Sequence, residues 1–452
     1  MGEDPGSSAR LGLVSTAIGA AIAIAVMDGV MVAVALPVMA RDLGISDSST
    51  ILVVSAYQLA MAALILPTSA LAARLGLKRV YIASIALLGI GSLACASAPS
   101  LGFLIAARIV QGAGGAGITA LTNALLRRLY PPSRLARAVG INAAVAALSL
   151  SAGPSIAALL LSLLSWRWLF LVNVPVMIFA IAAGLRWLGH EEPRARPSSA
   201  AGMLLSVTAI GATVVVLNLI AQGASPLWTA AGALVAAVAW PCFLTHQRRS
   251  GQPLLATSLM TTPSLRPAVA IYFLAAFAQT AAYIAVPFLL HGAGYGPVAI
   301  GLMFTAWPLS VLAVGPISAR FCGRYPLGLL GGAGLATMAT GLACLAVSPE
   351  AARPLMVGFV ALSGLGYGFY QIPNTQALIT AVPLARVADA TAMGALGRVI
   401  GQASGAATVA LGLRLLEGQG ASLALGLAAG TALLATVVSL GRTRRRKAPG
   451  GA

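Results

Sequence analysis

Residues 12–38 read GLVSTAIGAAIAIAVMDGVMVAVALPV, an almost unbroken apolar run that carries one charged residue, Asp28. A helix needs about 20 mostly apolar residues to cross about 30 Å of hydrocarbon, and this run is long enough. Similar runs follow to the end of the chain. The sequence therefore predicts an all-α membrane protein with fourteen transmembrane helices, at 12–38, 51–73, 80–98, 101–126, 136–163, 168–188, 202–221, 227–246, 267–290, 298–319, 327–347, 354–380, 390–415 and 421–441.

The composition of the whole chain supports this fold class. Of its 452 residues, 59% are hydrophobic and only 8% are charged, and the mean hydropathy is +0.93. A soluble domain carries about 25% charged residues, so the composition argues against a soluble enzyme, a disordered protein and a secreted disulfide scaffold. The four cysteines lack the spacing of metal ligands, and we expect neither a metal nor a cofactor.

The net charge of +18 does not indicate a nucleic-acid partner, because the basic residues form short clusters between apolar runs. Lys and Arg concentrate in cytoplasmic loops of membrane proteins. Most of the 28 basic residues share one predicted side, which places both termini in the cytoplasm and the protein in the cell (inner) membrane. The basic tail at 442–447 is expected to fix the end of the last helix.

Polar segments indicate how the spans are grouped. Gly189–Ala201 is polar and Pro-rich, and a second polar loop covers residues 248–266. Removing the two spans between them leaves six spans on each side. We predict three parts, namely a six-helix bundle at 1–188, a linker with two inserted helices at 189–266, and a second six-helix bundle with the basic tail at 267–452.

Short motifs also repeat between the two sides. ARLG at Ala73–Gly76 follows the second span, and ARFCGR at Ala319–Arg324 follows the tenth. Arg134–Ala138 and Arg386–Ala390 form a second pair of this kind. Together with the matching helix counts, these repeats predict a duplicated unit, the architecture of a rocking transporter whose site lies between its halves.

Asp28 is the only acidic residue in the middle of a span. A carboxylate there costs about 2.5–3.5 kcal/mol on insertion scales, so it should face a cavity or a partner and is functional by default. Apolar surroundings favour its neutral form, which would let it gain and lose a proton near neutral pH. The alternative is a purely structural buried pair.

Arg108 is the expected partner of Asp28. At a rise of about 1.5 Å per residue, Asp28 lies about 15 Å and Arg108 about 10 Å below the same membrane edge. Arg108, Gln111 and Gly112 share one helix face. Two unpaired buried charges would be costly, so we expect them to be close. Protonation of Asp28 would weaken the attraction and so couple proton binding to conformation.

These motifs resemble the major facilitator superfamily, specifically its fourteen-helix drug:proton antiporter branch. The similar stretches are Asp28 with Val34–Pro37, Arg108–Gly112 with Gly114, Gly115 and Gly117, the pair Gly153–Pro154, and Trp166–Pro175. The resemblance implies two six-helix bundles and a proton-coupled exporter of small hydrophobic or amphiphilic compounds such as drugs, working by alternating access. It also implies conformational motifs at Arg74, Gly76, Gly112, Gly153 and Pro154.

The chain departs from the family pattern at two places. Ala73 stands where the loop after the second helix usually has an acid, which puts the charge interaction of that loop in doubt. Ala157 and Ala158 replace a glycine pair of the antiporter motif. We therefore expect looser packing around Gly153–Pro154.

Polar and aromatic residues within the spans are candidates for a substrate cavity, although packing or a hydrogen bond between helices explains any single one equally well. The candidates are Tyr57, Gln58, Gln111, Asn142, Gln279, Tyr283, Trp307, Tyr370, Gln371 and Asn374. The series Gly397, Gly401 and Gly405 predicts a tight helix contact. Arg398 either extends to the cytoplasmic interface, which we favour, or lies in the cavity.

The nature of the substrate stays open. A single deep acid favours monovalent lipophilic cations and neutral or zwitterionic amphiphiles, while Arg108 and Arg398 leave anions open. No Gly-Lys-Ser/Thr phosphate-binding loop is present, so ATP is not expected to supply the energy. The expected partners are a small-molecule substrate, protons and the lipid bilayer, with the protein a monomer. Alternatives are an exporter dedicated to one endogenous metabolite, a lipid translocator, an intramembrane enzyme, and a sensor or scaffold.

Overall fold

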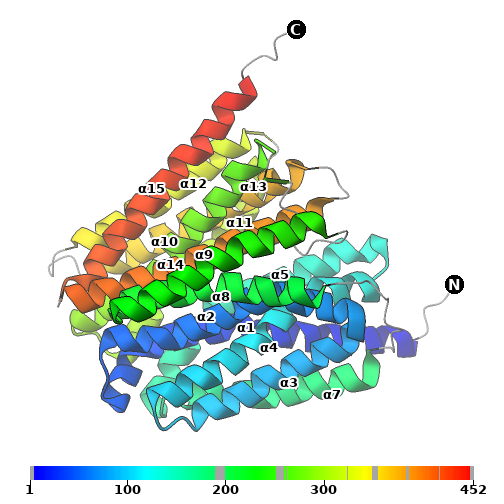
Figure 1. Cartoon of the computed structure of the whole chain (residues 1–452), viewed down its shortest axis with the longest axis horizontal. Coiled ribbons are helices and arrows are strands. Elements are labelled where there is room, and N and C mark those ends of the chain that lie inside the picture. The colour runs from blue at the N-terminus through cyan, green and yellow to red at the C-terminus, as the bar shows by residue number, and fades with distance from the viewer. Residues whose placement is uncertain are drawn as a thin grey trace.

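The computed structural model describes residues 5–188, 199–250, 259–260, 262–322, 324–348, 355–382, 386–416 and 418–447. In these ranges the chain forms helices and no strands, which confirms the predicted fold class. The helices lie side by side in one bundle, and α1 begins and α15 ends at the same end of it (Figure 1). Most of the polar segment Gly189–Ala201, at 189–198, and residues 251–258 of the second polar loop lie outside the described residues.

Helices occur at every predicted span. They are α1 (Pro5–Leu43), α2 (Asp47–Leu75), α3 (Leu77–Ala96), α4 (Leu101–Leu129), α5 (Pro132–Leu163), α6 (Trp168–Leu171), α7 (Asn173–Trp187), α8 (Ala200–Gln222), α9 (Pro226–Arg249), α10 (Leu265–Gly292), α11 (Pro297–Phe321), α12 (Leu327–Val347), α13 (Met356–Thr380), α14 (Val387–Leu415) and α15 (Gly420–Lys447). Of the described residues, eleven helical segments are long and apolar enough to cross a membrane, with α6 and α7 counted as one. The remaining predicted spans are α5, α13 and α14.

Helix packing follows the same scheme twice. In the N-terminal helix group (α1–α7), α1 packs on α5 and α7, and α4 packs on α2 and α3. In the C-terminal helix group (α10–α15), α10 packs on α14 and α15, and α13 packs on α11 and α12. The contacts between the groups also correspond, because α2 meets α14 and α5 meets α11. This is the arrangement that a duplicated six-helix unit produces.

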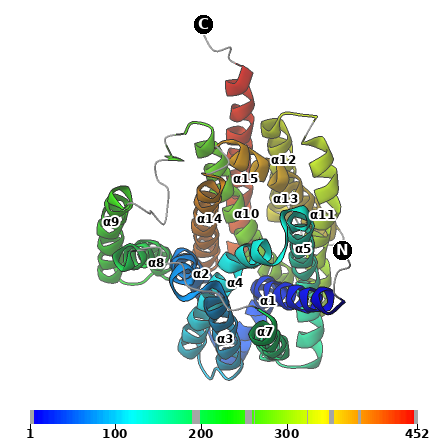
Figure 2. The ribbon, with the colours of Figure 1, turned by 90° about the vertical axis from the view of Figure 1, so that its right-hand side faces the viewer.

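The two inserted helices lie on one side of this bundle. α8 packs against α2 and α14, one helix from each group, and α9 packs on α8 (Figure 2). Most of α9 is exposed, with apolar side chains such as Leu227, Trp228 and Leu234 on its surface. Such a surface suits contact with lipid. α8 therefore covers one of the two seams between the helix groups.

Glycines allow the close approach of α14 to α10. A Cβ atom added to Gly401 would lie 2.2 Å from the carbonyl oxygen of Phe273, and one on Gly405 would lie 2.5 Å from that of Phe277. Gly397 faces the carbonyl oxygen of Val269 in the same way. Small residues at four-residue spacing commonly bring helices this close in lipid. The predicted tight contact at this glycine series is confirmed.

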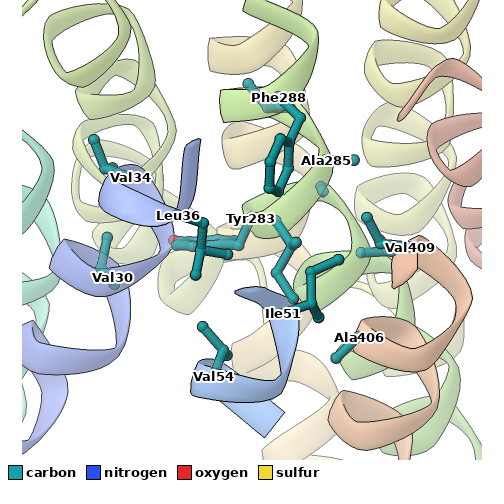
Figure 3. Close-up of a cluster of buried hydrophobic side chains, with 14 of the residues drawn as sticks. Val30, Val34, Leu36, Ile51, Val54, Tyr283, Ala285, Phe288, Ala406 and Val409 are labelled. Carbon is teal, nitrogen blue, oxygen red and sulfur yellow. The ribbon is translucent and has the colours of Figure 1, made fainter. Parts of the chain in front are cut away.

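The two groups share one buried core at the end of the bundle where α1 ends, which we call the Leu43 face. α1 is buried almost all round over residues 30–40, and α10 over residues 278–290. Figure 3 shows this core, in which apolar side chains of α1 and α2 meet those of α10 and α14. Its labelled members are Val30, Val34, Leu36, Ile51, Val54, Tyr283, Ala285, Phe288, Ala406 and Val409.

Toward the opposite end, the Pro5 face, most of the buried core is separate for the two groups. One buried cluster there contains only residues of the N-terminal group, between Val14 and Leu188. Another contains only residues of the C-terminal part, including Leu265, Leu378 and Ala390. Residues of α10 such as Tyr272 and Phe273, nearer the Pro5 face, are partly exposed. The helix groups are thus joined mainly at the Leu43 face. Smaller clusters also join α2 to α14 along the seam that α8 covers, with Leu66 and Met393 in one of them.

The crossing of α5 and α11 corrects the expectation of loose packing around Gly153–Pro154. Ala157 and Ala158 are fully buried. A Cβ atom on Gly301 of α11 would lie 2.3 Å from the Cβ atom of Ala158 and 2.5 Å from the carbonyl oxygen of Pro154. The packing is tight because the small residue lies on the partner helix. Ser155 and Thr305 add a hydrogen bond of 2.8 Å across this crossing.

We expect Gly301→Val to weaken the contact between the two helix groups. The added side chain overlaps Ala158, and overpacking of this kind costs about 1–3 kcal/mol. The melting temperature of the purified protein should therefore fall by several degrees. Gly315→Val is the matched control, because it lies on the same helix with no atom within 4 Å of an added Cβ. Equal effects of the two substitutions would contradict the tight crossing.

Candidate functional site

Asp28 and Arg108 form an ion pair inside the N-terminal helix group. Arg108 Nη1 donates a charge-assisted hydrogen bond to Asp28 Oδ2. The exposed fractions of their side chains are 1% and 0%. The predicted proximity of the two residues is confirmed. Because two such charges are excluded from water, each depends on the other for compensation.

Two side-chain amides complete the surroundings of the carboxylate. Gln111 Nε2 donates to Asp28 Oδ1 at 2.8 Å, and Asn173 Nδ2 donates to the same oxygen at 3.3 Å. Both amides also donate to Ser92 Oγ, at 2.8 and 3.4 Å. The carboxylate of Asp28 thus accepts hydrogen bonds from three side chains, and helices α1, α3, α4 and α7 each contribute to the network.

Arg108 has further contacts that fix its position. Its Nε donates to the carbonyl oxygen of Val53 at 3.0 Å, and its Nη1 also donates to Gln111 Oε1 at 2.5 Å. The guanidinium lies over the ring of Tyr57, 4.4 Å from its centroid, and 5.7 Å from that of Phe170. Cation–π contacts of this kind are stronger away from water. The arginine is therefore held by polar and aromatic groups together.

The glycines of α4 bring the network together. A Cβ atom on Gly112 would lie 2.5 Å from the carbonyl oxygen of Tyr57, and one on Gly115 would lie 2.4 Å from the Tyr57 hydroxyl. On the other side of the helix, Gly114 faces the backbone of Leu88 in α3 at 2.4 Å. The glycine run therefore lets α2 and α3 both approach α4, which places Tyr57 against Arg108.

Sequence reasoning missed two members of the network, Asn173 and Ser92. Asn173 is the first residue of α7, after the break that follows α6, and it is completely buried. A polar amide within the apolar stretch 168–188 was the available signal. Ser92 carried no comparable signal, because serine is common in transmembrane helices and satisfies itself by bonding to backbone.

The network is closed to the space between the helix groups. We expected Asp28 to face a cavity or a partner, and in this conformation it faces only its partners. The adjacent residues of α1, Met27 and Gly29, are partly exposed, so the side of α1 next to the carboxylate is open. Asp28 thus lies on a buried face of α1, next to the face that is partly exposed.

The candidate cavity residues of the N-terminal helix group fall into two sets, those that belong to the charge network and those that are partly exposed. Tyr57 and Gln111 are buried and contact Arg108. Gln58 and Asn142 are partly exposed, and their side-chain carbonyl oxygens accept no hydrogen bond from the described residues. These two oxygen atoms are buried, and a buried polar atom without a partner is costly, so a ligand or another conformation is expected to supply the partner. Gln58 and Asn142 therefore stay candidates for substrate contact.

The C-terminal candidates include an aromatic cluster, which consists of Tyr283, Phe304, Trp307, Tyr367 and Tyr370. The ring of Tyr283 lies edge-on to those of Phe304 and Trp307, with centroids 4.9 and 5.4 Å away. Tyr367 contacts Trp307 at 6.4 Å and Tyr370 at 5.1 Å. All five residues are buried. The cluster joins α10, α11 and α13, and Tyr283, Trp307 and Tyr370 are brought together as members of it.

Three polar candidates of the C-terminal group occupy different places. Gln279 lies beside Tyr283 and Tyr367 and is partly exposed. Gln371 is exposed on α13. Asn374 is fully buried and connects three helices, because its Nδ2 donates to the carbonyl oxygen of Ala268 at 3.3 Å and its Oδ1 accepts from Arg442 at 3.0 Å. The amide of Asn374 is occupied by these contacts.

The sequence left two positions open for Arg398, the cytoplasmic interface, which we favoured, and the cavity. In the structure, Tyr367 and Tyr370 of α13 lie within electrostatic range of its guanidinium. It is partly exposed. Arg398 lies eleven residues from the start of α14, about 16 Å along the helix axis, which is farther than an arginine side chain reaches. The second alternative, a place beside the cavity, fits these observations.

Two loop motifs are also defined. Gly76 is the only residue between α2 and α3, and its φ of 94° is one that L side chains rarely adopt. Arg74 is exposed at the end of α2. At the Leu43 face, Trp166 Nε1 and Arg167 Nη1 donate to Asp42 Oδ2 at 2.7 and 3.0 Å, so the start of the sixth predicted span is fixed to the end of α1.

Comparisons with known proteins agree with this architecture. The chain is 36% identical over 426 residues to an uncharacterized transporter, YebQ, of Escherichia coli (strain K12), with 92% of each chain covered. It is 30% identical to the multidrug resistance protein Stp of Mycobacterium tuberculosis, with 88% of this chain and 75% of Stp covered. It is also 30% identical to the methylenomycin A resistance protein of Streptomyces coelicolor, with 82% and 79% covered.

Solved structures show the same fold at low sequence identity. The peptide transporter POT in complex with sulfate superimposes with a TM-score of 0.72 at 15% identity, covering 96% of this chain and 94% of that one. A bacterial homologue of the human lysosomal transporter Spinster, in an inward-facing and unoccupied conformation, has a TM-score of 0.68 at 15% identity, with 98% of each chain covered.

The family model for the Major Facilitator Superfamily matches residues 17–406, a range that contains the whole charge network. Relatives named for multidrug resistance match over most of the chain. With the helix packing and the resistance-protein relatives together, the chain belongs to the Major Facilitator Superfamily, in its drug-efflux branch, and is a multi-pass membrane transporter.

Proposed function

We propose that this transporter is a proton-coupled antiporter that exports small hydrophobic or amphiphilic compounds by alternating access. Asp28 would carry the proton, and Arg108 would sense whether the proton is bound. The observation that supports this role is the single buried carboxylate in the spans, held by three donors. Resistance proteins among the relatives support the class of substrate.

The chemistry of the network gives each protonation state a preferred structure. An ionised carboxylate is an acceptor on both oxygens, and it matches the three donors around Asp28. A protonated Asp28 no longer attracts Arg108, and an uncompensated buried charge costs about 3–5 kcal/mol. Proton binding would therefore favour a conformation in which the pair has separated. The closed pair corresponds to the deprotonated state.

The packing of the two helix groups supports a position for the deprotonated, closed pair in the transport cycle. The groups share their largest core at the Leu43 face, while toward the Pro5 face most of their cores are separate. The basic residues predict that the Pro5 face is cytoplasmic. Asp28 would then have released its proton to the cytoplasm, and the exposed side of α1 would receive substrate. A small rotation of α1 would expose the carboxyl for the next proton.

We expect Asp28→Asn to abolish efflux driven by a proton gradient, because asparagine keeps the shape but cannot exchange a proton. The measurement is transport of the neutral probe phenylnaphthylamine by the purified protein in vesicles with an imposed pH gradient, with at least a tenfold loss of the gradient-driven rate. Asp42→Asn is the matched control, since Asp42 lies on the same helix near its exposed end. Gradient-driven transport by Asp28→Asn would overturn the proposal.

We expect Asn173→Ala to shift the pH dependence of transport upward. The amide stabilises the ionised form of Asp28, so its loss makes proton binding easier at a given pH. A hydrogen bond to a charged group contributes about 1.5–3 kcal/mol, and about 1.4 kcal/mol corresponds to one pH unit. The midpoint of the pH–rate profile should rise by about one unit. Asn218→Ala, whose amide bonds to Val214 in α8, should leave the midpoint unchanged.

The range of compounds transported distinguishes the proposed exporter from a transporter dedicated to one endogenous compound. If the proposal holds, chemically different probes move under the same pH gradient, and each competes with the others. Transport of one probe alone, with no competition by the rest, would favour the dedicated exporter.

A further inference from the structure

Arg398 is a cation within the spans for which the described residues supply no hydrogen-bonded or ion-paired acid. Asp28 is the only acidic residue in the middle of a predicted span, and its carboxylate is occupied by Arg108. Asp389, on the same helix, is nine residues away, about 13 Å along the axis. A charged side chain within the membrane faces a partner or a water-filled space and marks a functional site by default.

The face of α14 that carries Arg398 is partly exposed, unlike the faces that pack on α10 and α8. Gly397, Gly401 and Gly405 face α10. Leu396 and Val399 pack with residues of α2 and α8. Arg398 and Gln402 are one helical turn apart on the remaining side, and both are partly exposed.

The groups opposite this face are polar and aromatic. α13 packs beside α14, and its Tyr367 and Tyr370 lie within electrostatic range of the Arg398 guanidinium. Gln279 of α10 lies beside Tyr367, and Gln371, one turn further along α13, is exposed. Uncharged donors next to a cation suit a carboxylate, sulfonate or phosphate, whereas a cationic ligand would be repelled. Of the aromatic cluster, Tyr367 keeps 7% of its surface exposed, and an aromatic edge of this kind suits a flat apolar body.

We propose that Arg398 is the substrate-binding residue for amphiphilic anions, with Gln279, Gln371 and Gln402 around the anionic group and Tyr367 against the apolar body. The inference deepens the proposed export function and rests on it. A cationic compound would find no free acid among the described residues of the spans. Selectivity for anionic over cationic amphiphiles is thus a property of this site and not of the proton site.

The test uses a matched pair of probes in vesicles of phosphatidylcholine with an imposed pH gradient. Anilinonaphthalene sulfonate and phenylnaphthylamine share an aromatic body, and only the first carries a sulfonate. Arg398→Gln should lower the ratio of sulfonate to amine transport at least tenfold, since charge-assisted bonds contribute about 1.5–3 kcal/mol. Arg398→Lys should restore part of the ratio. Arg414→Gln, the same change at the end of α14, should not alter it.

Gln402→Glu tests the inference without removing the arginine. The new carboxylate lies one turn from Arg398 and neutralises it, so the sulfonate-to-amine ratio should again fall at least fivefold. This variant also serves if Arg398→Gln does not reach the membrane. An unchanged ratio in Gln402→Glu or in folded Arg398→Gln would overturn the role of Arg398.

The outcomes also separate this inference from the proposed function. If ethidium or the amine moves under the gradient and the sulfonate does not, the export function stands and the anion site is refuted. If the gradient drives no probe, the export function fails, and fluorescence binding of the sulfonate to the purified full-length protein decides the site. Arg398→Gln should then weaken that binding at least tenfold, and equal binding would refute the site.

Discussion

The structure depends on the cost of placing charge away from water. Asp28 and Arg108 are both buried among apolar helices, and neither is stable there without the other. Their pairing requires α1 and α4 to meet at one depth. The amides of Gln111 and Asn173 donate to the same carboxylate and so connect α4 and α7 to α1. The ion pair therefore defines the interior of the N-terminal helix group. It also makes that interior sensitive to a single proton.

Small residues let the rest of the bundle form around this pair. Gly112 and Gly115 admit Tyr57 to a position over the guanidinium, and the glycine series of α14 admits α10. At the α5–α11 crossing, the residue that allows the close approach lies on α11, where Gly301 faces Ala158 of α5. Close helix contacts in lipid depend on the sum of two side chains, so a large residue on one helix is compensated by a small one on its partner.

The two helix groups have different electrostatic characters. The N-terminal group contains a neutralised pair that is closed to the exposed side of α1. The C-terminal group has no acid in its spans and contains an aromatic cluster with a cation beside it. Under the proposed function, the residue that would bind the proton is separate from the residues that would bind the substrate. The two would then be linked through the rocking of the groups and not through direct competition for one carboxylate.

The sequence by itself determined the helices, the repeated organisation and the pairing of Asp28 with Arg108. The length of the apolar runs and the cost of an isolated buried charge leave few alternative folds and few alternative partners for Asp28. Both the runs and the charges can be read directly from the sequence. Only the tertiary structure decided the side-chain partners. Asn173 and Ser92 belong to the network around Asp28, Asn374 accepts a hydrogen bond from Arg442, and Arg398 lies within electrostatic range of Tyr367. The physical reason is that a polar residue in an apolar helix must find a partner, and its rotational position relative to helices distant in the sequence determines which one.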